Sequence, residues 1–259
     1  MPFTSVAGAR IYWKLEGSEG ASPLILLNSI GTDMDLWEPL LPALRQHFLL
    51  LRIDTRGHGA SPAEPGDFAM ALLARDVLAV AHDAGIGRFA VAGVSLGGMI
   101  AMELALRRPE QVRALALVCT SATMDAGSWD DRIAKVRGQG MAAIVDLAMG
   151  RFLSAQTQEG DPALYETIAR GLLSMDPQGY AGCGAAIRDM DLAGRISAIR
   201  CPTLIVTGTR DSSTPFEGHG EQLLARIPGA SHLAIAAAHL APLEAPDALA
   251  AALIPFLEC

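Results

Sequence analysis

A serine stands between two glycines where one apolar run ends and a second begins, in the segment VAGVSLGGMI of residues 91–100. The spacing of Gly93, Ser95 and Gly97 matches the pattern G-x-S-x-G, which is typical of a sharp turn from a strand into a helix. Glycine permits such a turn, and the first N–H groups of the helix can stabilise negative charge nearby. The segment therefore predicts that Ser95 is a nucleophile for acyl transfer, with an ordinary glycine-rich turn as the alternative.

A serine hydroxyl is a weak nucleophile near neutral pH, so this chemistry requires a histidine base and a carboxylate that orients it. In hydrolases with this turn the acid and then the histidine follow the serine along the chain. Asp211, directly after an apolar run, is the expected acid. His239 and His232 are the candidate bases, and His232 precedes residues 233–238, which we expect to form the last strand. Because a residue before that strand would lie at the wrong edge of the sheet, we favour His239.

The negative charge that forms on the carbonyl oxygen during such an attack requires two hydrogen-bond donors held in place. One donor is expected to be the backbone N–H of Leu96, the residue after the nucleophile, and the other comes from an early loop. We assign the second donor to the N–H of Ile30, in the segment NSIGTD of residues 28–33. Leu96 and Ile30 are thus the predicted oxyanion hole.

The apolar runs that must position these groups alternate between two types, which is the pattern of strands joined by crossover helices. Short continuous runs are typical of parallel strands covered on both faces. Residues 3–6 and 9–17 predict an opening antiparallel hairpin. We therefore predict an α/β protein with a mostly parallel eight-stranded sheet flanked by helices. The other strand runs are residues 23–28, 49–54, 88–94, 113–119 and 202–208, and the helical patterns are residues 37–48, 70–85, 97–109, 220–227 and 246–257.

One long stretch, residues 124–191, contains helical patterns and no strand-like run. It follows the sixth expected strand, and an insertion there would lie at the carboxyl ends of the strands, where ligands bind in open α/β sheets. We expect residues 124–191 to be a helical lid and residues 1–123 and 192–259 to form the core of the fold.

Composition and short motifs disfavour several classes of function for this chain of 259 residues. A formal net charge of −8 predicts no basic face for nucleic acid. The sequence has neither a signal-peptide pattern nor a run of about 18 apolar residues, so we expect a cytoplasmic protein without a membrane partner. Cys119, Cys183, Cys201 and Cys259 lack metal-ligand spacing. We expect reduced, mostly buried thiols, no metal and no cofactor.

Seven segments spread along the chain carry a recognisable pattern: NSIGTDMDLWEP, RIDTRGHGAS, GVSLGGMIAM, CTSA, GYAGCGAAIRDMDL, TGTRDSSTP and AAHLAPLEAPDAL. Together they resemble the α/β-hydrolases and, within them, the 3-oxoadipate enol-lactone hydrolases of aromatic catabolism. The resemblance extends over nearly the whole chain and is weakest in the middle of residues 124–191. It implies the α/β-hydrolase fold, with Ser95, Asp211 and His239 as the catalytic triad and Ile30 and Leu96 as oxyanion donors.

The resemblance also implies a carboxylic ester hydrolase, a lactonase of the β-ketoadipate pathway that opens 3-oxoadipate enol-lactone to 3-oxoadipate. This substrate is a five-membered unsaturated lactone that bears a carboxylate, and such an anion requires a cation or N–H donors near the nucleophile. The expected lid contains Arg132, Arg137, Arg151 and Arg188. We expect Arg132, close to Trp129, to bind the carboxylate and Arg151 to be the next candidate, with Trp129 lining the pocket.

Two other functions fit the same residues. A cofactor-free haloperoxidase-type enzyme or a general carboxylesterase would keep the triad and accept neutral esters, and the arginines would then be incidental. A non-catalytic binding protein with the hydrolase fold is disfavoured by the intact set of Ser95, Asp211 and His239 in the expected order. The sequence thus predicts a small-molecule partner and leaves the oligomeric state open.

Overall fold

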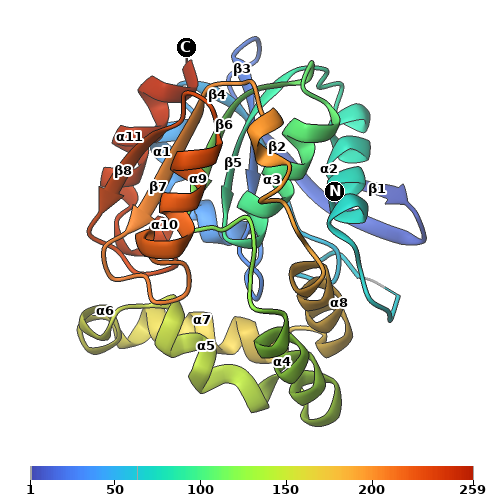
Figure 1. The fold of residues 1–259 in the computed structure, drawn as a ribbon. Coiled ribbons are helices and arrows are strands. Elements are labelled where there is room, and N and C mark those ends of the chain that lie inside the picture. The colour runs from blue at the N-terminus through green and yellow to red at the C-terminus, as the bar shows by residue number, and fades with distance from the viewer. Residues whose placement is uncertain (1, 63, 259) are drawn as a thin grey trace.

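An eight-stranded sheet forms the centre of the molecule in a computed structural model that describes residues 2–62 and 64–258. Its strands are β1 (Phe3–Val6), β2 (Ala9–Gly17), β3 (Ser22–Leu27), β4 (Phe48–Ile53), β5 (Phe89–Val94), β6 (Val112–Val118), β7 (Thr203–Gly208) and β8 (Ser231–Ile235). Their order is β1-β2-β4-β3-β5-β6-β7-β8 (Figure 1). β2 is antiparallel to β1 and β4, and all other neighbouring strands are parallel. The predicted α/β class and mostly parallel sheet are confirmed.

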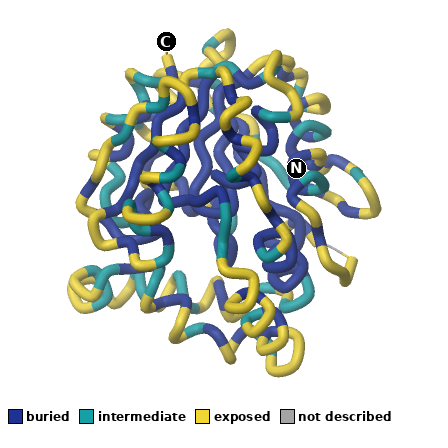
Figure 2. Tube along the Cα trace, in the orientation of Figure 1, coloured by how far each residue is buried: buried dark blue, intermediate teal, exposed yellow. Residues whose placement is uncertain are grey.

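Helices cover both faces of this sheet. α2 (Met70–Asp83), α3 (Leu96–Arg107) and α9 (Glu221–Arg226) lie on one face, in front of the strands in Figure 1, and α1 (Leu41–Leu44) and α11 (Pro246–Glu258) lie on the other. Every residue of β5 and β7 is therefore buried, and Figure 2 shows the buried strands running through the centre of the molecule. Burial on both faces explains why these strands are continuous apolar runs in the sequence. Short helical segments complete the core: η1 (Met34–Leu40), η3 (Ile196–Ala198), η4 (Phe216–Gly220) and α10 (Ala241–Glu244).

The chain between β6 and β7 forms helices and no strand. These helices lie together beyond one end of the sheet, at the bottom of Figure 1, next to the point where β5 passes into α3. We call residues 124–191 the helical insertion. It contains α4 (Ala126–Gln139), η2 (Met141–Ile144), α5 (Val145–Phe152), α6 (Ala155–Gly160), α7 (Pro162–Ser174) and α8 (Pro177–Arg188).

Two elements differ from the sequence prediction. The last strand, β8, begins at Ser231 and ends at Ile235, so the prediction of a strand over residues 233–238 placed it too late. The helical pattern of residues 37–48 covers the end of the 3-10 segment η1, a single turn of α-helix (α1) and a turn, and Phe48 is already the first residue of β4. Pro39 and Pro42 explain the second difference, because proline lacks the N–H that a continuous α-helix requires.

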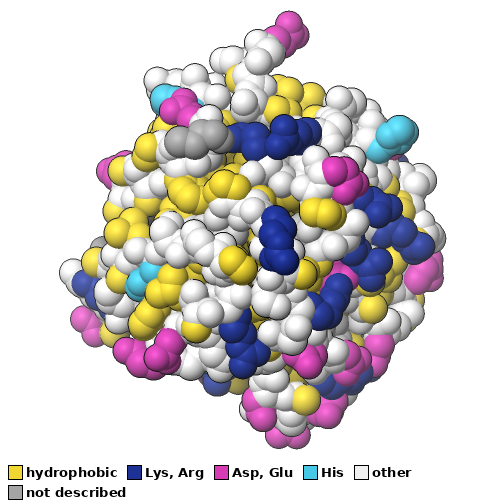
Figure 3. All heavy atoms as spheres, turned by 45° about the horizontal axis from the view of Figure 1, so that its top comes forward, with side chains coloured by type: hydrophobic (Ala, Val, Ile, Leu, Met, Phe, Trp, Pro, Cys, Tyr) yellow, Lys and Arg dark blue, Asp and Glu magenta, His cyan; other side chains and the backbone are white. Residues whose placement is uncertain are grey.

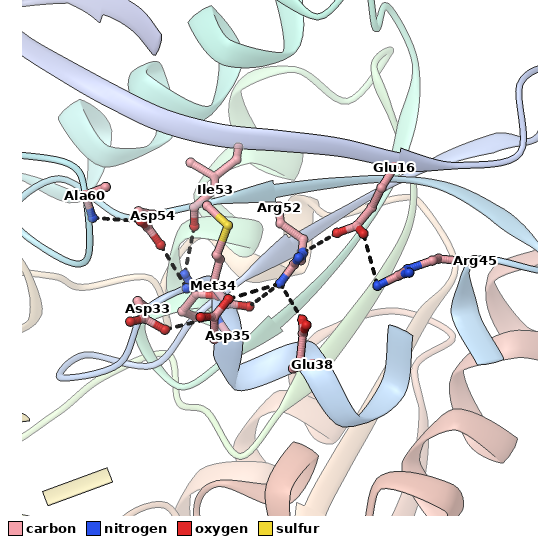
Figure 4. A network of polar contacts seen from close by, with 11 residues as sticks. Glu16, Asp33, Met34, Asp35, Glu38, Arg45, Arg52, Ile53, Asp54 and Ala60 are labelled. Atoms are coloured by element: carbon pink, nitrogen blue, oxygen red, sulfur yellow. Dashed lines mark hydrogen bonds and ion pairs between the residues drawn. The ribbon is translucent and has the colours of Figure 1, made fainter. Parts of the chain in front are cut away.

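A buried arginine anchors η1 to the sheet. Arg52 on β4 is only 3% exposed, and a buried charge must be paired. Its guanidinium donates to Glu16 on β2 and to Asp35 and Glu38 of η1, and it also reaches the carbonyl oxygen of Met34 (Figure 4). Because η1 directly follows the loop of residues 28–33, this network fixes where that loop ends.

Asp54, directly after β4, forms a second anchor for the same segment. Its carboxylate accepts hydrogen bonds from the N–H groups of Met34 and Ala60 (Figure 4). Burial raises the pKa of Asp54 to about 6, although both N–H groups favour the charged form. The turn that follows β4 is thereby tied to the start of η1.

Close packing of two glycines joins the helical insertion to this turn. A Cβ atom on Gly179 of α8 would lie 2.5 Å from the Cα and O atoms of Gly57. Both contacts involve backbone atoms, so relieving the clash would require the backbone to move at a cost in free energy. We expect Gly179→Ala to destabilise the protein by about 1–3 kcal/mol through overpacking. Thermal unfolding should show a Tm lowered by roughly 2–4 °C for each kcal/mol. Gly171→Ala on α7 is the matched control, because a Cβ atom there meets nothing within 4 Å. An equal Tm for the two variants would contradict this packing.

Candidate active site

Ser95 lies at the turn between β5 and α3, in a conformation that side chains rarely adopt. Its φ is +54°, so the residue is strained as expected for a serine lifted out of a sharp turn. A Cβ atom on Gly93 would lie 2.3 Å from the backbone of Gly97, and one on Gly97 would lie 2.4 Å from the carbonyl oxygen of Leu27. The turn therefore requires glycine at both positions. The hydroxyl of Thr120 donates to the carbonyl oxygen of Ser95 and holds the strained residue in place.

Asp211 and His239 contact each other in the buried loops that follow β7 and β8. The Nδ1 atom of His239 lies 3.1 Å and 3.0 Å from the two carboxylate oxygens. The same carboxylate accepts hydrogen bonds from the N–H of Ser213 and from the N–H and hydroxyl of Thr214. Because an ionised carboxylate only accepts, Nδ1 of His239 must carry the hydrogen. Nε2 is then the nitrogen that can act as a base.

The charge state of Asp211 follows from its surroundings. Burial by itself raises the pKa of this carboxyl, but the charge and hydrogen bond of His239 and the donation from Thr214 outweigh burial. The pKa of Asp211 therefore lies well below its usual range. The carboxylate remains ionised at neutral pH and can stabilise a positive charge that forms on the imidazole.

A cavity joins Ser95 and His239. It lies between the sheet edge and the helical insertion, which contributes side chains from α4, α5 and α8. Its lining residues are Ile30, Ser95, Met99, Met124, Trp129, Arg132, Ala148, Arg151, Phe152, Ile187, Ser213, Thr214 and His239. Of the residues that the sequence analysis favours for the site, Asp211 and Leu96 do not line this cavity, and the others do: Ile30, Ser95, Trp129, Arg132, Arg151 and His239.

The two candidate oxyanion donors are available for a ligand. Leu96 is the first residue of α3, so its N–H has no acceptor within the helix. Within the described chain, the N–H of Ile30 has no acceptor either, whereas the neighbouring N–H groups of Gly31 and Thr32 are both hydrogen-bonded. The N–H of Ile30 is thus available as a donor on a loop that lines the same cavity as Ser95.

Two of the four arginines considered from the sequence reach the cavity. Neither Arg132 nor Arg151 has an acidic partner within residues 2–62 and 64–258. The guanidinium of Arg132 lies 4.6 Å from the ring centroid of Trp129. Partial burial and the charge of Arg132 lower the pKa of Arg151. The cavity therefore holds two cations without a counter-charge from the described part of the chain.

The other two arginines lie at the surface of the insertion. Arg137 and Arg188 both pair with Asp67, and Arg188 also pairs with Asp130 and Asp189. Their charges are already neutralised, so they are structural ion pairs rather than ligands for the cavity.

The structure also separates the two candidate histidines. His232 lies within β8, where its Nε2 atom is 2.8 Å from the hydroxyl of Thr207 and its ring stacks on Phe216. It does not line the cavity. Only His239 reaches Asp211, so the choice of His239 agrees with the geometry, although the last strand begins earlier than predicted.

Sequence reasoning missed Phe152 and Glu244. The ring of Phe152 stacks on His239 with centroids 6.3 Å apart. The carboxylate of Glu244 accepts hydrogen bonds from the N–H groups of Ala238 and Ser154, and so ties the histidine loop to the insertion. No spacing in the sequence reveals these contacts, because they join segments far apart in the chain.

Other classes of site are not found in the described part of the chain. Among residues 2–62 and 64–258, no group of three or more His, Cys, Asp or Glu side chains is placed to hold a metal ion. None of their helices has the length and hydropathy needed to cross a membrane. Cys119, Cys183 and Cys201 are free thiols, and Cys259 lies outside the described residues. On the face shown in Figure 3, basic side chains lie among acidic ones.

Known proteins share this architecture. A family model described as alpha/beta hydrolase fold matches residues 22–246. The chain is 28% identical over 233 residues to 3-oxoadipate enol-lactonase 2 of Acinetobacter baylyi, with 90% of this chain and 87% of that protein covered. The crystal structure of the enol-lactonase from Burkholderia xenovorans LB400 is 32% identical, with a TM-score of 0.96 and 99% of each chain covered. The crystal structure of a hydrolase from Pseudomonas aeruginosa PA01 is 36% identical, with a TM-score of 0.96 and 100% of this chain and 98% of that chain covered.

Proposed function

The chain belongs to the alpha/beta hydrolase family, and on that basis we propose that it is a serine hydrolase that opens 3-oxoadipate enol-lactone to 3-oxoadipate. This reaction belongs to the catabolism of aromatic compounds. The observation that supports the proposal most strongly is the pair of cations, Arg132 and Arg151, on the same cavity as Ser95 and His239. A neutral ester has no negatively charged group that these two arginines could bind, whereas the enol-lactone carries a carboxylate.

In the proposed reaction, Oγ of Ser95 attacks the lactone carbonyl carbon while Nε2 of His239 takes its proton. The N–H groups of Ile30 and Leu96 donate to the oxyanion that forms. The ring C–O bond then breaks, and His239 returns the proton to the leaving enol oxygen, which remains part of the acyl chain. Water activated by His239 releases the acid, and the enol tautomerises to the ketone. Asp211 keeps the imidazole in the required tautomer throughout.

The helical insertion completes the site in this proposal. Arg132 and Trp129 come from α4, Arg151 comes from the last turn of α5, and all three line the cavity. Residues 124–191 therefore act as a lid that selects the substrate, while residues 1–123 and 192–259 hold the nucleophile, the base and the oxyanion donors. The enol-lactonases among the similar proteins support the same substrate class.

A comparison of two substrates tests the role of the arginines. We expect the enzyme to hydrolyse 3-oxoadipate enol-lactone, followed by its ultraviolet absorbance, with a higher kcat/KM than p-nitrophenyl acetate. Arg132→Gln and Arg151→Gln should each lower kcat/KM for the lactone by about 10- to 100-fold, mainly through KM, because a charge-assisted hydrogen bond contributes about 1.5–3 kcal/mol. Neither variant should change hydrolysis of the neutral ester by more than a few fold.

Arg137→Gln is the control for this comparison, because that arginine lies in the same insertion but pairs with Asp67. It should leave both substrates unaffected. If the wild type prefers the neutral ester, and the variants of Arg132 and Arg151 reduce both activities equally, the protein is a general carboxylesterase and the lactone assignment is wrong.

A further inference from the structure

His58 lies directly behind the loop that presents Ile30 to the cavity. The residue belongs to the turn after β4 and is 1% exposed. Its Nε2 atom is 3.1 Å from the backbone N of Gly31, and its Nδ1 atom is 3.2 Å from the carbonyl oxygen of Arg56. The Gly31 N–H can only donate and the Arg56 carbonyl can only accept. His58 is therefore a neutral imidazole with its hydrogen on Nδ1.

The bond from Gly31 to His58 holds one of the two peptide groups that flank Ile30. Gly31 adopts a φ of +84°, and its N–H belongs to the peptide group that directly follows Ile30. The N–H of Thr32 donates to the carbonyl oxygen of Ser29 and closes the turn around these residues. The carbonyl oxygen of Ser29 belongs to the same peptide group as the Ile30 N–H, so Thr32 holds that group, and His58 holds the next peptide group through the Gly31 N–H. The two peptide groups that flank Ile30 together set the direction of the Ile30 N–H.

We propose that His58 is a positioning residue, whose Nε2 atom aims the Ile30 N–H at the oxyanion by accepting a hydrogen bond from Gly31. The inference rests on the proposed serine hydrolase chemistry, and it adds a function for a histidine that does not itself touch the cavity. Its contribution arises in the transition state, because the Ile30 N–H is needed most when negative charge develops on the carbonyl oxygen.

The surroundings of His58 keep the accepting nitrogen free of a proton. Burial lowers the pKa of His58 to about 4, and the more distant charge of Asp176 opposes this only weakly. α8 of the insertion covers the imidazole. The ring of Tyr180 stacks on it with centroids 6.5 Å apart, and Sγ of Cys183 lies 4.0 Å from Nδ1. The imidazole has no acidic side chain in hydrogen-bond contact within the described chain.

Two amide variants separate the two nitrogens of His58. The amide of His58→Gln can place its oxygen near the position of Nε2 and accept from Gly31, whereas the shorter amide of His58→Asn reaches only the position of Nδ1. We expect His58→Gln to retain kcat within a few fold for both the lactone and p-nitrophenyl acetate. His58→Asn should lower kcat by about 10- to 100-fold with little change in KM, because only transition-state stabilisation is lost. Phenylboronic acid forms a tetrahedral adduct with the serine, and its inhibition of His58→Asn should weaken in parallel with the loss of kcat.

Ser61→Ala controls for general damage to the same turn. The Ser61 hydroxyl donates to the carbonyl oxygen of Asp54 and accepts from the N–H of Tyr12, so its loss disturbs the turn without touching Gly31. This variant should lower Tm and leave kcat unchanged. Equal kcat values for His58→Gln and His58→Asn, or kcat losses that follow Tm in all three variants, would overturn the proposal.

A measurement on the unmodified protein gives an independent answer if a variant fails to fold. The ¹⁵N chemical shifts of the His58 ring should show a protonated Nδ1 and an unprotonated Nε2 at neutral pH, and a hydrogen on Nε2 would overturn the proposal. The neutral ester keeps this test separate from the substrate assignment. If the wild type cleaves p-nitrophenyl acetate but not the lactone, and His58→Asn impairs this cleavage, the lactone assignment is wrong and the role of His58 is retained.

Discussion

Ser95→Ala is expected to lower kcat for the lactone by about 10⁴- to 10⁶-fold, the range found when the nucleophile of a serine hydrolase is removed. The loss should be this large because the cavity offers no second hydroxyl in the same relation to His239 and the oxyanion donors. Ser213 and Thr214 also line the cavity, but the hydroxyl of Thr214 donates to Asp211, and Ser213 lies in the loop after β7 and not at the turn into α3 that carries the Leu96 N–H. A steady-state assay of lactone absorbance, with active-site titration of the wild type, measures the effect.

Folding and binding should survive this substitution. Alanine at position 95 keeps the strained φ of +54°, so its Tm should stay close to that of the wild type. Titration calorimetry with 3-oxoadipate should also give a similar Kd, since the arginines that we propose bind the carboxylate are intact. Retention of more than about 1% of the wild-type kcat would show that Ser95 is not the nucleophile. If the wild type cleaves the ester but not the lactone, and the well-folded variant loses ester cleavage, Ser95 is the nucleophile but the lactone is not the substrate.

Asp211→Asn is expected to lower kcat by about 10⁴-fold. An asparagine can donate from its amide to Nδ1 of His239, and the hydrogen of the imidazole would then move to Nε2, where the base must be free. The variant also lacks the negative charge that stabilises the protonated imidazole. Rates measured from pH 5 to pH 10 should recover partly at high pH, where hydroxide can replace the base. Asp130→Asn is the matched control, because that carboxylate pairs with Arg188 at the surface, and it should leave kcat unchanged.

The same substitution should change the response of stability to acid. The pKa of Asp211 in the folded protein lies below its usual value near 3.8, so the ionised form is favoured by folding. This contribution is present above the pKa of the unfolded state and is lost as pH falls through the lower pKa of the folded state. Denaturant unfolding between pH 5 and pH 2 should therefore show a shallower loss of stability for Asp211→Asn than for the wild type. Parallel curves for the two proteins would contradict an ionised, folding-coupled Asp211.

Much of the fold could be predicted from the sequence because its signals are local. Continuous apolar runs mark the strands that are covered on both faces, and all eight strands exist. The resemblance to the α/β-hydrolases, and within them to the enol-lactonases, is confirmed by the similar proteins. The turn at Ser95 was also predictable, since Gly93 and Gly97 are needed wherever this backbone path occurs. Boundaries were less accurate, as the earlier start of β8 shows, because pairing with β7 decides where that strand begins.

The contacts of the arginines could not be predicted from the sequence. Arg132 and Arg137 belong to the same helix, α4, and are five positions apart, so their side chains point about 140° apart around the helix axis. The charged residues of α4 do not reveal which side faces the sheet. Packing of α4 against α8 decides this, and it turns Arg132 to the cavity and Arg137 to Asp67.

The sequence by itself determined the strand-turn-helix around Ser95, the order of Ser95, Asp211 and His239, and the alternation of strands and helices. These features depend on neighbouring residues, through backbone conformation and the period of apolar positions. The tertiary structure alone decided that Phe152 stacks on His239 and that His58 accepts from Gly31. Both contacts join segments that are distant along the chain. The first exists only once the insertion has packed against the edge of the sheet, and the second only once β3 and β4 have paired and brought the loops that follow them together.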